Sequence, residues 1–118
     1  MLVVEISTHT DSRRKLFEII GQLQLDIDIK HLYFSNINPE MTVATHYHKK
    51  KTEWIAILQG KAEITIGSET HITTKPILVE VPVNRWHSVK NIGPGQLQLL
   101  GIGNQPYDPK NPDVFSEE

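Results

Sequence analysis

The sequence contains no cysteine among its 118 residues. This absence excludes disulfide scaffolds, cysteine-ligated zinc sites and thiol nucleophiles. No apolar run approaches the roughly 18 residues of a membrane-spanning helix, so we expect no membrane association. Residues 1–5 lack the basic region followed by a long apolar region that marks a signal peptide. We therefore expect a cytoplasmic protein.

An excess of charge of either sign is also missing. The chain has 12 lysines and arginines against 14 aspartates and glutamates, which gives a net charge of −2 with neutral histidine. Nucleic-acid-binding domains usually carry a strongly basic patch, so we expect no nucleic-acid partner. The length suits one domain, and we predict that residues 1–118 form a single domain.

Short segments rich in Ile, Val, Thr and Leu lie between seven glycines and seven prolines. Residues 54–58 form a continuous apolar run, typical of a strand buried on both faces. Residues 62–66 alternate between apolar and polar, which indicates a strand with one inward face. Further strands are predicted at 71–74, 77–81, 88–92 and 96–102. This spacing predicts an all-β sandwich or barrel of about 8–11 strands.

The first 35 residues leave two interpretations open. Residues 11–23 could form a helix that is capped by Thr10 or Asp11, and periodicity alone slightly favours this helix. Alternatively, residues 15–20 could form a strand. Residues 25–29 alternate strictly and predict a strand that residues 30–34 continue.

A cluster of candidate metal ligands follows in the middle of the chain. His46 and His48 are two residues apart, so in a strand their side chains point to the same face. Glu53 follows a polar, turn-like segment at 49–52, which would return it to that face on the next strand. His87 follows another predicted strand. Three neutral imidazoles and one carboxylate suit a divalent metal ion, with positions left for water or substrate.

Less specific interpretations of these residues exist. Two surface histidines on an edge strand would give the same spacing as His46 and His48. The three lysines at 49–51 suit a solvated turn, or they could attract a phosphorylated substrate. The ligand set does not choose between zinc, manganese, iron and nickel.

Two motifs carry a resemblance to a known family. The pattern His46-x-His48-x4-Glu53-x6-Gly60 resembles the first motif of the cupin superfamily. The glycine that usually opens that motif is Glu40 here.

The second motif lies further along the chain. Pro82-x-Asn84-x2-His87-x3-Asn91 resembles the second cupin motif, with Asn84 where glycine is usual and Pro76 in place of the opening glycine. The resemblance implies a small cupin-type β-barrel, or jelly roll, with four metal ligands inside it: His46, His48, Glu53 and His87.

A narrower resemblance extends over nearly the whole chain. Residues 11–19, 28–34 and 45–48 resemble segments of cupins that act on nucleotide-activated sugars, and residues 104–113 resemble the closing segment of one subgroup. That subgroup is the cupin domain of capsular-polysaccharide-assembly enzymes, which epimerises a UDP-linked keto sugar. The resemblance implies a homodimer, and it shifts the interpretation of 15–20 from helix to strand. Arg14 replaces a glycine of the opening motif, and Ala44 and Thr45 replace the Arg-Gly pair before the histidines.

These expectations define one main function and two alternatives. The main one is a metal-dependent isomerase or epimerase of a nucleotide-linked or phosphorylated keto sugar in surface-polysaccharide biosynthesis. The first alternative is a metal-containing binding module for a small sugar or acid, without turnover. The second is an iron-dependent dioxygenase. The proton-transfer residue is unassigned, with Tyr33, Tyr107 and His31 as unranked options.

Overall fold

The structure is a computed structural model that describes residues 1–20 and 26–116. These residues form eleven β-strands and no α-helix, as the sequence predicted. None of the described residues therefore belongs to a helix able to cross a membrane. The strands are β1 (Val3–Glu5), β2 (Ser7–Thr10), β3 (Lys15–Glu18), β4 (His31–Ile37), β5 (Thr42–His46), β6 (Glu53–Gln59), β7 (Ala62–Ile66), β8 (Glu69–Thr73), β9 (Ile77–Val81), β10 (His87–Asn91) and β11 (Leu97–Gly103).

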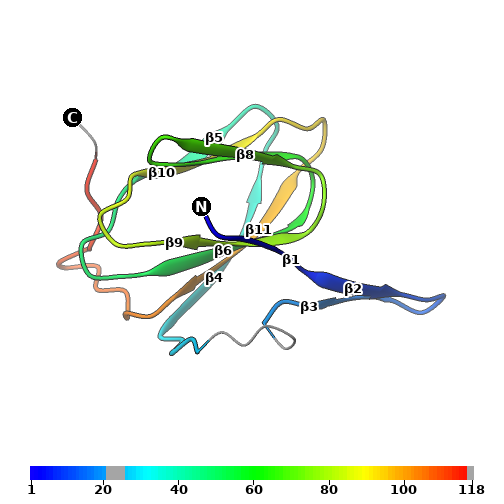
Figure 1. Cartoon of the computed structure of the whole chain (residues 1–118), viewed down its shortest axis with the longest axis horizontal. Helices are drawn as coiled ribbons and strands as arrows, with labels where there is room; N and C mark the ends of the chain where they lie inside the picture. Colours follow the sequence, from blue (N-terminus) through cyan, green and yellow to red (C-terminus); the bar gives the residue numbers. More distant parts are fainter. Residues whose placement is uncertain (21–25, 117–118) are drawn as a thin grey trace.

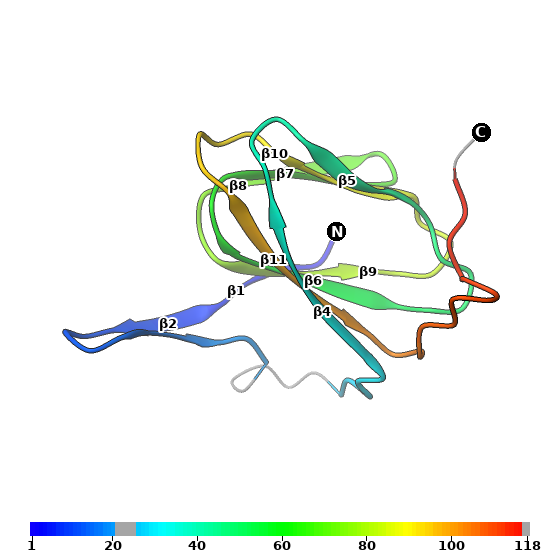
Figure 2. The ribbon, with the colours of Figure 1, turned by 180° about the vertical axis from the view of Figure 1, so that it is seen from behind.

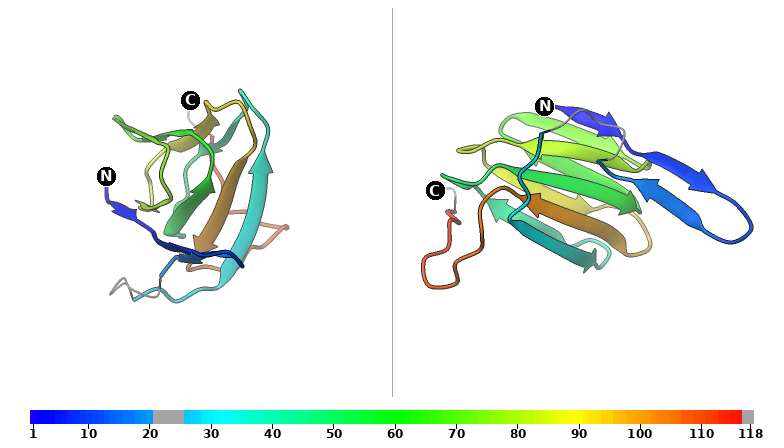
Figure 3. Two further views of the ribbon diagram at one scale, coloured as in Figure 1. Left: turned by 90° about the vertical axis from the view of Figure 1, so that its right-hand side faces the viewer. Right: turned by 90° about the horizontal axis from the view of Figure 1, so that it is seen from below.

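The strands form two main sheets and a hairpin (Figure 1). One sheet has the order β1-β9-β6-β11-β4, and the other has the order β5-β10-β7-β8. Every strand pair in them is antiparallel. The two sheets face each other across the interior (Figure 3), while the β2–β3 hairpin projects away from them. The result is the predicted antiparallel jelly roll.

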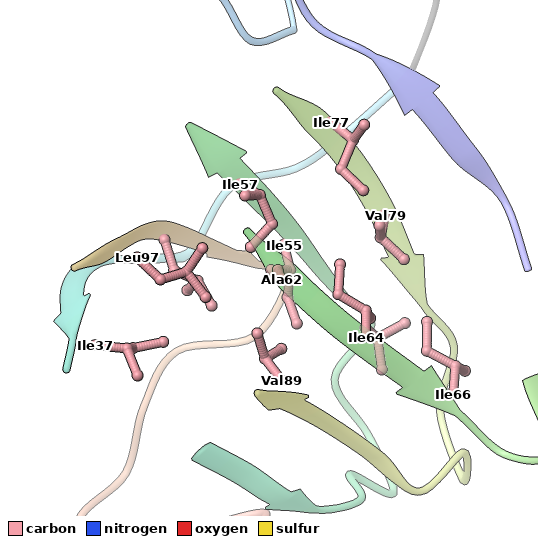
Figure 4. Packing of buried hydrophobic residues seen from close by; sticks show 12 residues of the cluster. Ile37, Ile55, Ile57, Ala62, Ile64, Ile66, Ile77, Val79, Val89 and Leu97 are labelled. Carbon is pink, nitrogen blue, oxygen red and sulfur yellow. The ribbon is translucent and has the colours of Figure 1, made fainter. Parts of the chain in front are cut away.

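The interior is filled mainly by branched aliphatic side chains. The period-two alternation of β7 buries Ala62, Ile64 and Ile66 between the sheets, as predicted for 62–66. Ile55 and Ile57 of β6 join them from the opposite sheet (Figure 4). Burying one such side chain stabilises the fold by about 1.5–3 kcal/mol before the entropy of ordering is subtracted. This cluster provides the folding core.

The other face of β6 is also covered. Trp54 and Ala56 form a second buried cluster with residues of β9 and β11, and part of the N-terminal segment packs over it: Phe17, Ile19, Ile20 and Ile27. The continuous apolar run at 54–58 thus belongs to a strand that is buried on both faces, as its sequence predicted.

The N-terminal region resolves the choice between helix and strand. Lys15–Glu18 forms β3 and pairs with β2, which confirms the strand interpretation over those four residues. Asp11 does not cap a helix, because its carboxylate Oδ1 accepts the backbone N–H groups of Arg13 at 2.8 Å and Arg14 at 3.2 Å within the turn of this hairpin. Leu23, on the alternative helical face, lies outside the described residues.

The strand expected over 25–34 was placed too early. Leu25 lies outside the described residues, and residues 26–30 are not in a strand. Strand β4 begins at His31, which pairs with Gly103, the last residue of β11. Before that point the partner strand has ended, so the alternating pattern has no neighbour with which to form a ladder.

Three non-glycine residues among those described adopt a left-handed backbone conformation. Their φ angles are 71° for Glu40, 58° for Ala44 and 62° for Asn84. Glu40 and Asn84 occupy positions where the cupin motifs usually have glycine. Gly67 also has a positive φ, of 58°, in the turn between β7 and β8.

Candidate functional site

Three histidines from separate positions in the chain meet at one end of the interior. His46 ends β5, His48 lies in the loop after it, and His87 begins β10 directly opposite His46 in the sheet. One ring nitrogen of each lies within 4.8 Å of the others. The structure therefore brings together the three histidines that the sequence analysis singled out.

The ring orientations of His48 and His87 leave one nitrogen of each facing the cluster. His48 Nδ1 lies 2.6 Å from the carbonyl oxygen of Asp113, and His87 Nδ1 lies 3.3 Å from that of Arg85. A carbonyl oxygen only accepts, so both Nδ1 atoms carry the proton. Both Nε2 atoms are buried, and neither has a hydrogen-bond partner within residues 1–20 and 26–116. Buried polar atoms are normally paired, so this donor set fits a divalent metal ion.

Glu53, the fourth predicted ligand, lies beside two of the three histidines. Its carboxylate oxygens are 3.8 Å from His48 Nε2 and 4.0 Å from His87 Nε2. Two other groups hold this carboxylate in place. The hydroxyl of Tyr33 donates to Oε1 at 3.1 Å, and the ammonium group of Lys51 lies 3.0 Å from Oε2.

The electrostatics of the cluster favour the protonation states that bind metal. Burial, followed by the proximity of His87 and His48, lowers the pKa of His46 to about 4. Burial also lowers the pKa of His87. Burial alone would raise the pKa of Glu53, but the Lys51 charge and hydrogen bond hold it below its ordinary value. At neutral pH the site thus presents neutral imidazoles at His46 and His87 and a carboxylate at Glu53.

Two glycines of β11 make room for the groups that hold Glu53. A Cβ atom on Gly101 would lie 2.0 Å from Cζ of Tyr33, and one on Gly103 would lie 2.7 Å from Cδ of Lys51. Any larger residue at either position would displace a partner of Glu53. The absence of side chains at these two positions is therefore part of the site.

Lys51 is the residue that the sequence interpretation missed. Its side chain is only 12% exposed and pairs with Glu53, whereas Lys49 and Lys50 are exposed as expected for a solvated turn. No local pattern separates these three lysines.

Among the unranked proton-transfer options, Tyr33 is the one in contact with the candidate ligands. It lies on the inward face of β4, which the period-two pattern of that strand could have indicated. His31 stacks on Tyr107, with ring centres 5.7 Å apart, and lies beside the ring of Tyr33.

Comparison with known protein families gives a match over most of the chain. Residues 9–115 match the family described as "Polysaccharide biosynthesis C-terminal domain". A curated relative, the UDP-2-acetamido-2,6-beta-L-arabino-hexul-4-ose reductase of Pseudomonas aeruginosa, is 26% identical over 120 residues. That alignment covers 95% of this chain and 31% of the reductase, so the chain spans about a third of that relative.

Solved structures share the fold. The capsular polysaccharide assembling protein CapF of Staphylococcus aureus superimposes with a TM-score of 0.69 at 23% identity, covering 96% of this chain and 34% of CapF. QdtA of Thermoanaerobacterium thermosaccharolyticum, a sugar 3,4-ketoisomerase solved in complex with TDP, gives 0.72 at 21% identity, covering 98% and 87%. These neighbours are cupin jelly rolls, which confirms the cupin fold predicted from the two motifs.

Proposed function

The chain belongs to the family of polysaccharide biosynthesis C-terminal domains, and on that premise we propose that it is a metal-dependent isomerase or epimerase of a nucleotide-linked keto sugar. The observation that carries the proposal is a pair of buried nitrogen atoms, Nε2 of His48 and Nε2 of His87, beside His46 and Glu53. In the part of the chain that the structure describes, neither atom has a hydrogen-bond partner. A nucleotide-linked substrate is supported by relatives that are named for a UDP-sugar or were solved with TDP.

The residues divide into ligands and supporting groups. His46, His48 and His87 would hold a divalent ion, with Glu53 as a fourth ligand. A carboxylate has about four lone-pair positions, and Tyr33 and Lys51 use two of those on Glu53. When bound, the ion supplies a Lewis acid that polarises a carbonyl oxygen. Zinc, manganese, iron and nickel all suit this donor set, so the identity of the metal stays a prediction.

The charges and hydrogen bonds around the ligands decide which groups are protonated at neutral pH. Epimerisation or isomerisation beside a carbonyl needs a group that removes a proton and one that returns it. Burial and the neighbouring Glu53 charge raise the pKa of Tyr33. Tyr33 therefore keeps its proton at neutral pH, where its hydroxyl donates a hydrogen bond to Glu53, and it is not the base. Lys51 holds Glu53 ionised.

The test is deuterium incorporation at the carbon beside the carbonyl of UDP- and dTDP-4-keto sugars in deuterated water. We expect exchange with the metal-loaded protein and loss of both metal and exchange in His48→Ala, with circular dichroism unchanged. His71→Ala removes a histidine of β8 outside the cluster and is the matched control. No exchange by metal-loaded protein would favour the binding module. Exchange that survives metal removal would keep the sugar chemistry and discard the metal.

We also propose that the partner is a second copy of the chain. The edge strand β4 exposes Leu32 and Phe34, at 58% and 52%, on the outer face of its sheet. The chain itself covers only part of that face, through residues such as Phe17 and Ile19. We expect a dimer by light scattering and a monomer for Phe34→Glu. Ile72→Glu, at an equally exposed site on the other sheet, should leave the dimer intact. The cytoplasmic location stays a prediction.

A further inference from the structure

The segment after β11 returns to the end of the barrel that holds the histidines. Residues 104–116 run beside the loop between β5 and β6 (Figure 2). Tyr47 and Phe115 exchange two backbone hydrogen bonds, of 2.9 and 3.0 Å, and their rings stack with centres 5.5 Å apart. Lys49 places its ammonium group 4.1 Å from the centre of the Phe115 ring. This closing segment is therefore docked against the site.

One residue of the closing segment contacts both the ligand loop and a candidate ligand. The carboxylate of Asp113 accepts backbone N–H groups from three successive residues, Lys49 at 2.9 Å, Lys50 at 2.8 Å and Lys51 at 2.9 Å. Its backbone carbonyl accepts the Nδ1–H of His48 at 2.6 Å. Burial would raise the pKa of Asp113, but the three N–H donors hold it below its ordinary value. The carboxylate is ionised at neutral pH.

These contacts determine how two site residues are presented. Since the Asp113 carbonyl can only accept, it fixes the proton of His48 on Nδ1 and directs the lone pair of Nε2 towards the cluster. The carboxylate holds the backbone of the turn from which Lys51 reaches Glu53. A group behind a metal-ligating histidine commonly fixes its tautomer and its ring orientation.

We propose that Asp113 is a positioning residue that sets the tautomer and orientation of His48 and the course of the turn at 49–51. Only the expected effect of Asp113 on metal affinity rests on the proposed metal site. Its effect on the His48 tautomer exists in the metal-free chain.

Variants of two aspartates and one threonine separate positioning from general stability. Asp113→Ala removes all three carboxylate hydrogen bonds and so loosens the carbonyl behind His48. Asp113→Asn keeps one acceptor oxygen and should give a partial rescue. Asp108→Ala removes an acid of the same segment whose carboxylate accepts the backbone N–H of Lys110 in its own turn. Thr73→Ala removes two hydrogen bonds to the Lys75 backbone at the far end of β8.

Two measurements on the full chain report the role. Long-range ¹H–¹⁵N correlation spectra of the metal-free protein should show His48 as the Nδ1–H tautomer, and as a mixture in Asp113→Ala. Competition with a chelator should show Zn²⁺ affinity falling about 10- to 100-fold in Asp113→Ala, the range typical of groups behind metal ligands. The decrease should be smaller in Asp113→Asn. Asp108→Ala and Thr73→Ala should change neither quantity.

The outcomes distinguish this role from the proposed function. An unchanged tautomer and Zn²⁺ affinity in folded Asp113→Ala or Asp113→Asn would overturn the positioning role and leave the metal site standing. An equal loss of Zn²⁺ affinity in Asp108→Ala would mean that the removed negative charge, and not the position of Asp113, causes the effect. That result would also overturn the positioning role. If the wild-type chain binds no Zn²⁺, the metal site fails, and the tautomer of His48 still decides the role of Asp113.

Discussion

Strand β10 carries a fully buried polar residue at each end, and the two differ in how their polar atoms are satisfied. At one end, Asn91 donates from Nδ2 to the carbonyl groups of Ile37 and Gly95 at 2.9 and 2.8 Å, and its Oδ1 accepts the N–H of Gly93 at 2.9 Å. At the other end, Nε2 of His87 has no hydrogen-bond partner among the described residues. Asn91 thus holds the fold together, whereas His87 has an atom left for a ligand.

The neighbouring strands also differ between their two ends in the side chains that they direct inward. On β6, the inward side chain is apolar at Ile57 and charged at Glu53. On β11, the buried Leu97 at one end contrasts with the space-making Gly101 and Gly103 at the other. The end of the interior that holds Ile57 and Leu97, the apolar end, is filled by buried aliphatic side chains. The end that holds His87 and Glu53, the polar end, carries buried nitrogen atoms with no hydrogen-bond partner among the described residues. Four perturbations would sharpen or break this contrast.

The largest expected effect is on the apolar end. Ile57→Ala should lower the free energy of unfolding by about 2–5 kcal/mol, because it leaves a cavity in a core that packs around a side chain only 1% exposed. Urea denaturation measures the loss. Ile72→Ala, at a position 58% exposed, is the control and should change stability by less than about 0.5 kcal/mol. A large loss of bound metal in folded Ile57→Ala would break the contrast.

A reciprocal pair tests the two ends of β10 directly. Asn91→Ala should cost about 3 kcal/mol, since three hydrogen bonds of about 1 kcal/mol each are lost, with metal content unchanged. His87→Ala should do the reverse and remove the metal at a smaller cost in stability. Metal analysis and urea denaturation on both variants check this. Equal stability losses, or metal retained in His87→Ala, would contradict it.

The next prediction concerns Gly101, which leaves room for the Tyr33 ring beside Glu53. Gly101→Ala would place Cβ 2.0 Å from Tyr33 Cζ, so the ring must move away and lose its hydrogen bond to Glu53. Overpacking of this kind costs about 1–3 kcal/mol, and we expect weaker Zn²⁺ binding as well. Gly95→Ala is the matched control, because the new Cβ meets no atom of a described residue within 4 Å. Unchanged thermal stability and Zn²⁺ affinity in Gly101→Ala would show that Tyr33 adapts freely.

The smallest expected effect is on how the free energy of unfolding depends on pH, through His46. Burial, followed by the proximity of His87 and His48, lowers the pKa of His46 from its ordinary value of 6.5 to about 4 in the folded state, so the unfolded chain binds more protons between these values. The free energy of unfolding of the metal-free protein should fall as pH drops from 6.5 towards 4. His46→Gln should show a shallower decline, measured by denaturation across that range. An equal change in slope from His71→Gln would assign the effect to histidine content in general.

Local patterns were sufficient for much of the fold. The strands predicted at 62–66 and 77–81 are β7 and β9 with their observed bounds. Each pattern reflects the face of one strand, and a strand's face depends mainly on its own residues. The start of β4 was harder to predict because it depends on where β11 ends.

Local patterns predicted only some of the residues of the candidate site. Spacing together with the resemblance to the two cupin motifs indicated His46, His48, Glu53 and His87, because neighbouring strands bring short motifs together. It could not indicate Asp113, which reaches His48 from 65 positions along the chain. Nor could it separate Lys51 from Lys49 and Lys50, since burial of one lysine depends on Gly103 and Glu53 from other strands.

The left-handed residues Glu40 and Asn84 have a consequence for how such chains are recognised. Their φ angles of 71° and 62° keep the backbone course of positions where the cupin motifs usually have glycine. A side chain in this conformation costs roughly 1–2 kcal/mol, and less for asparagine. A search pattern that demands those glycines would pass over this protein, whereas one written in backbone angles would find it.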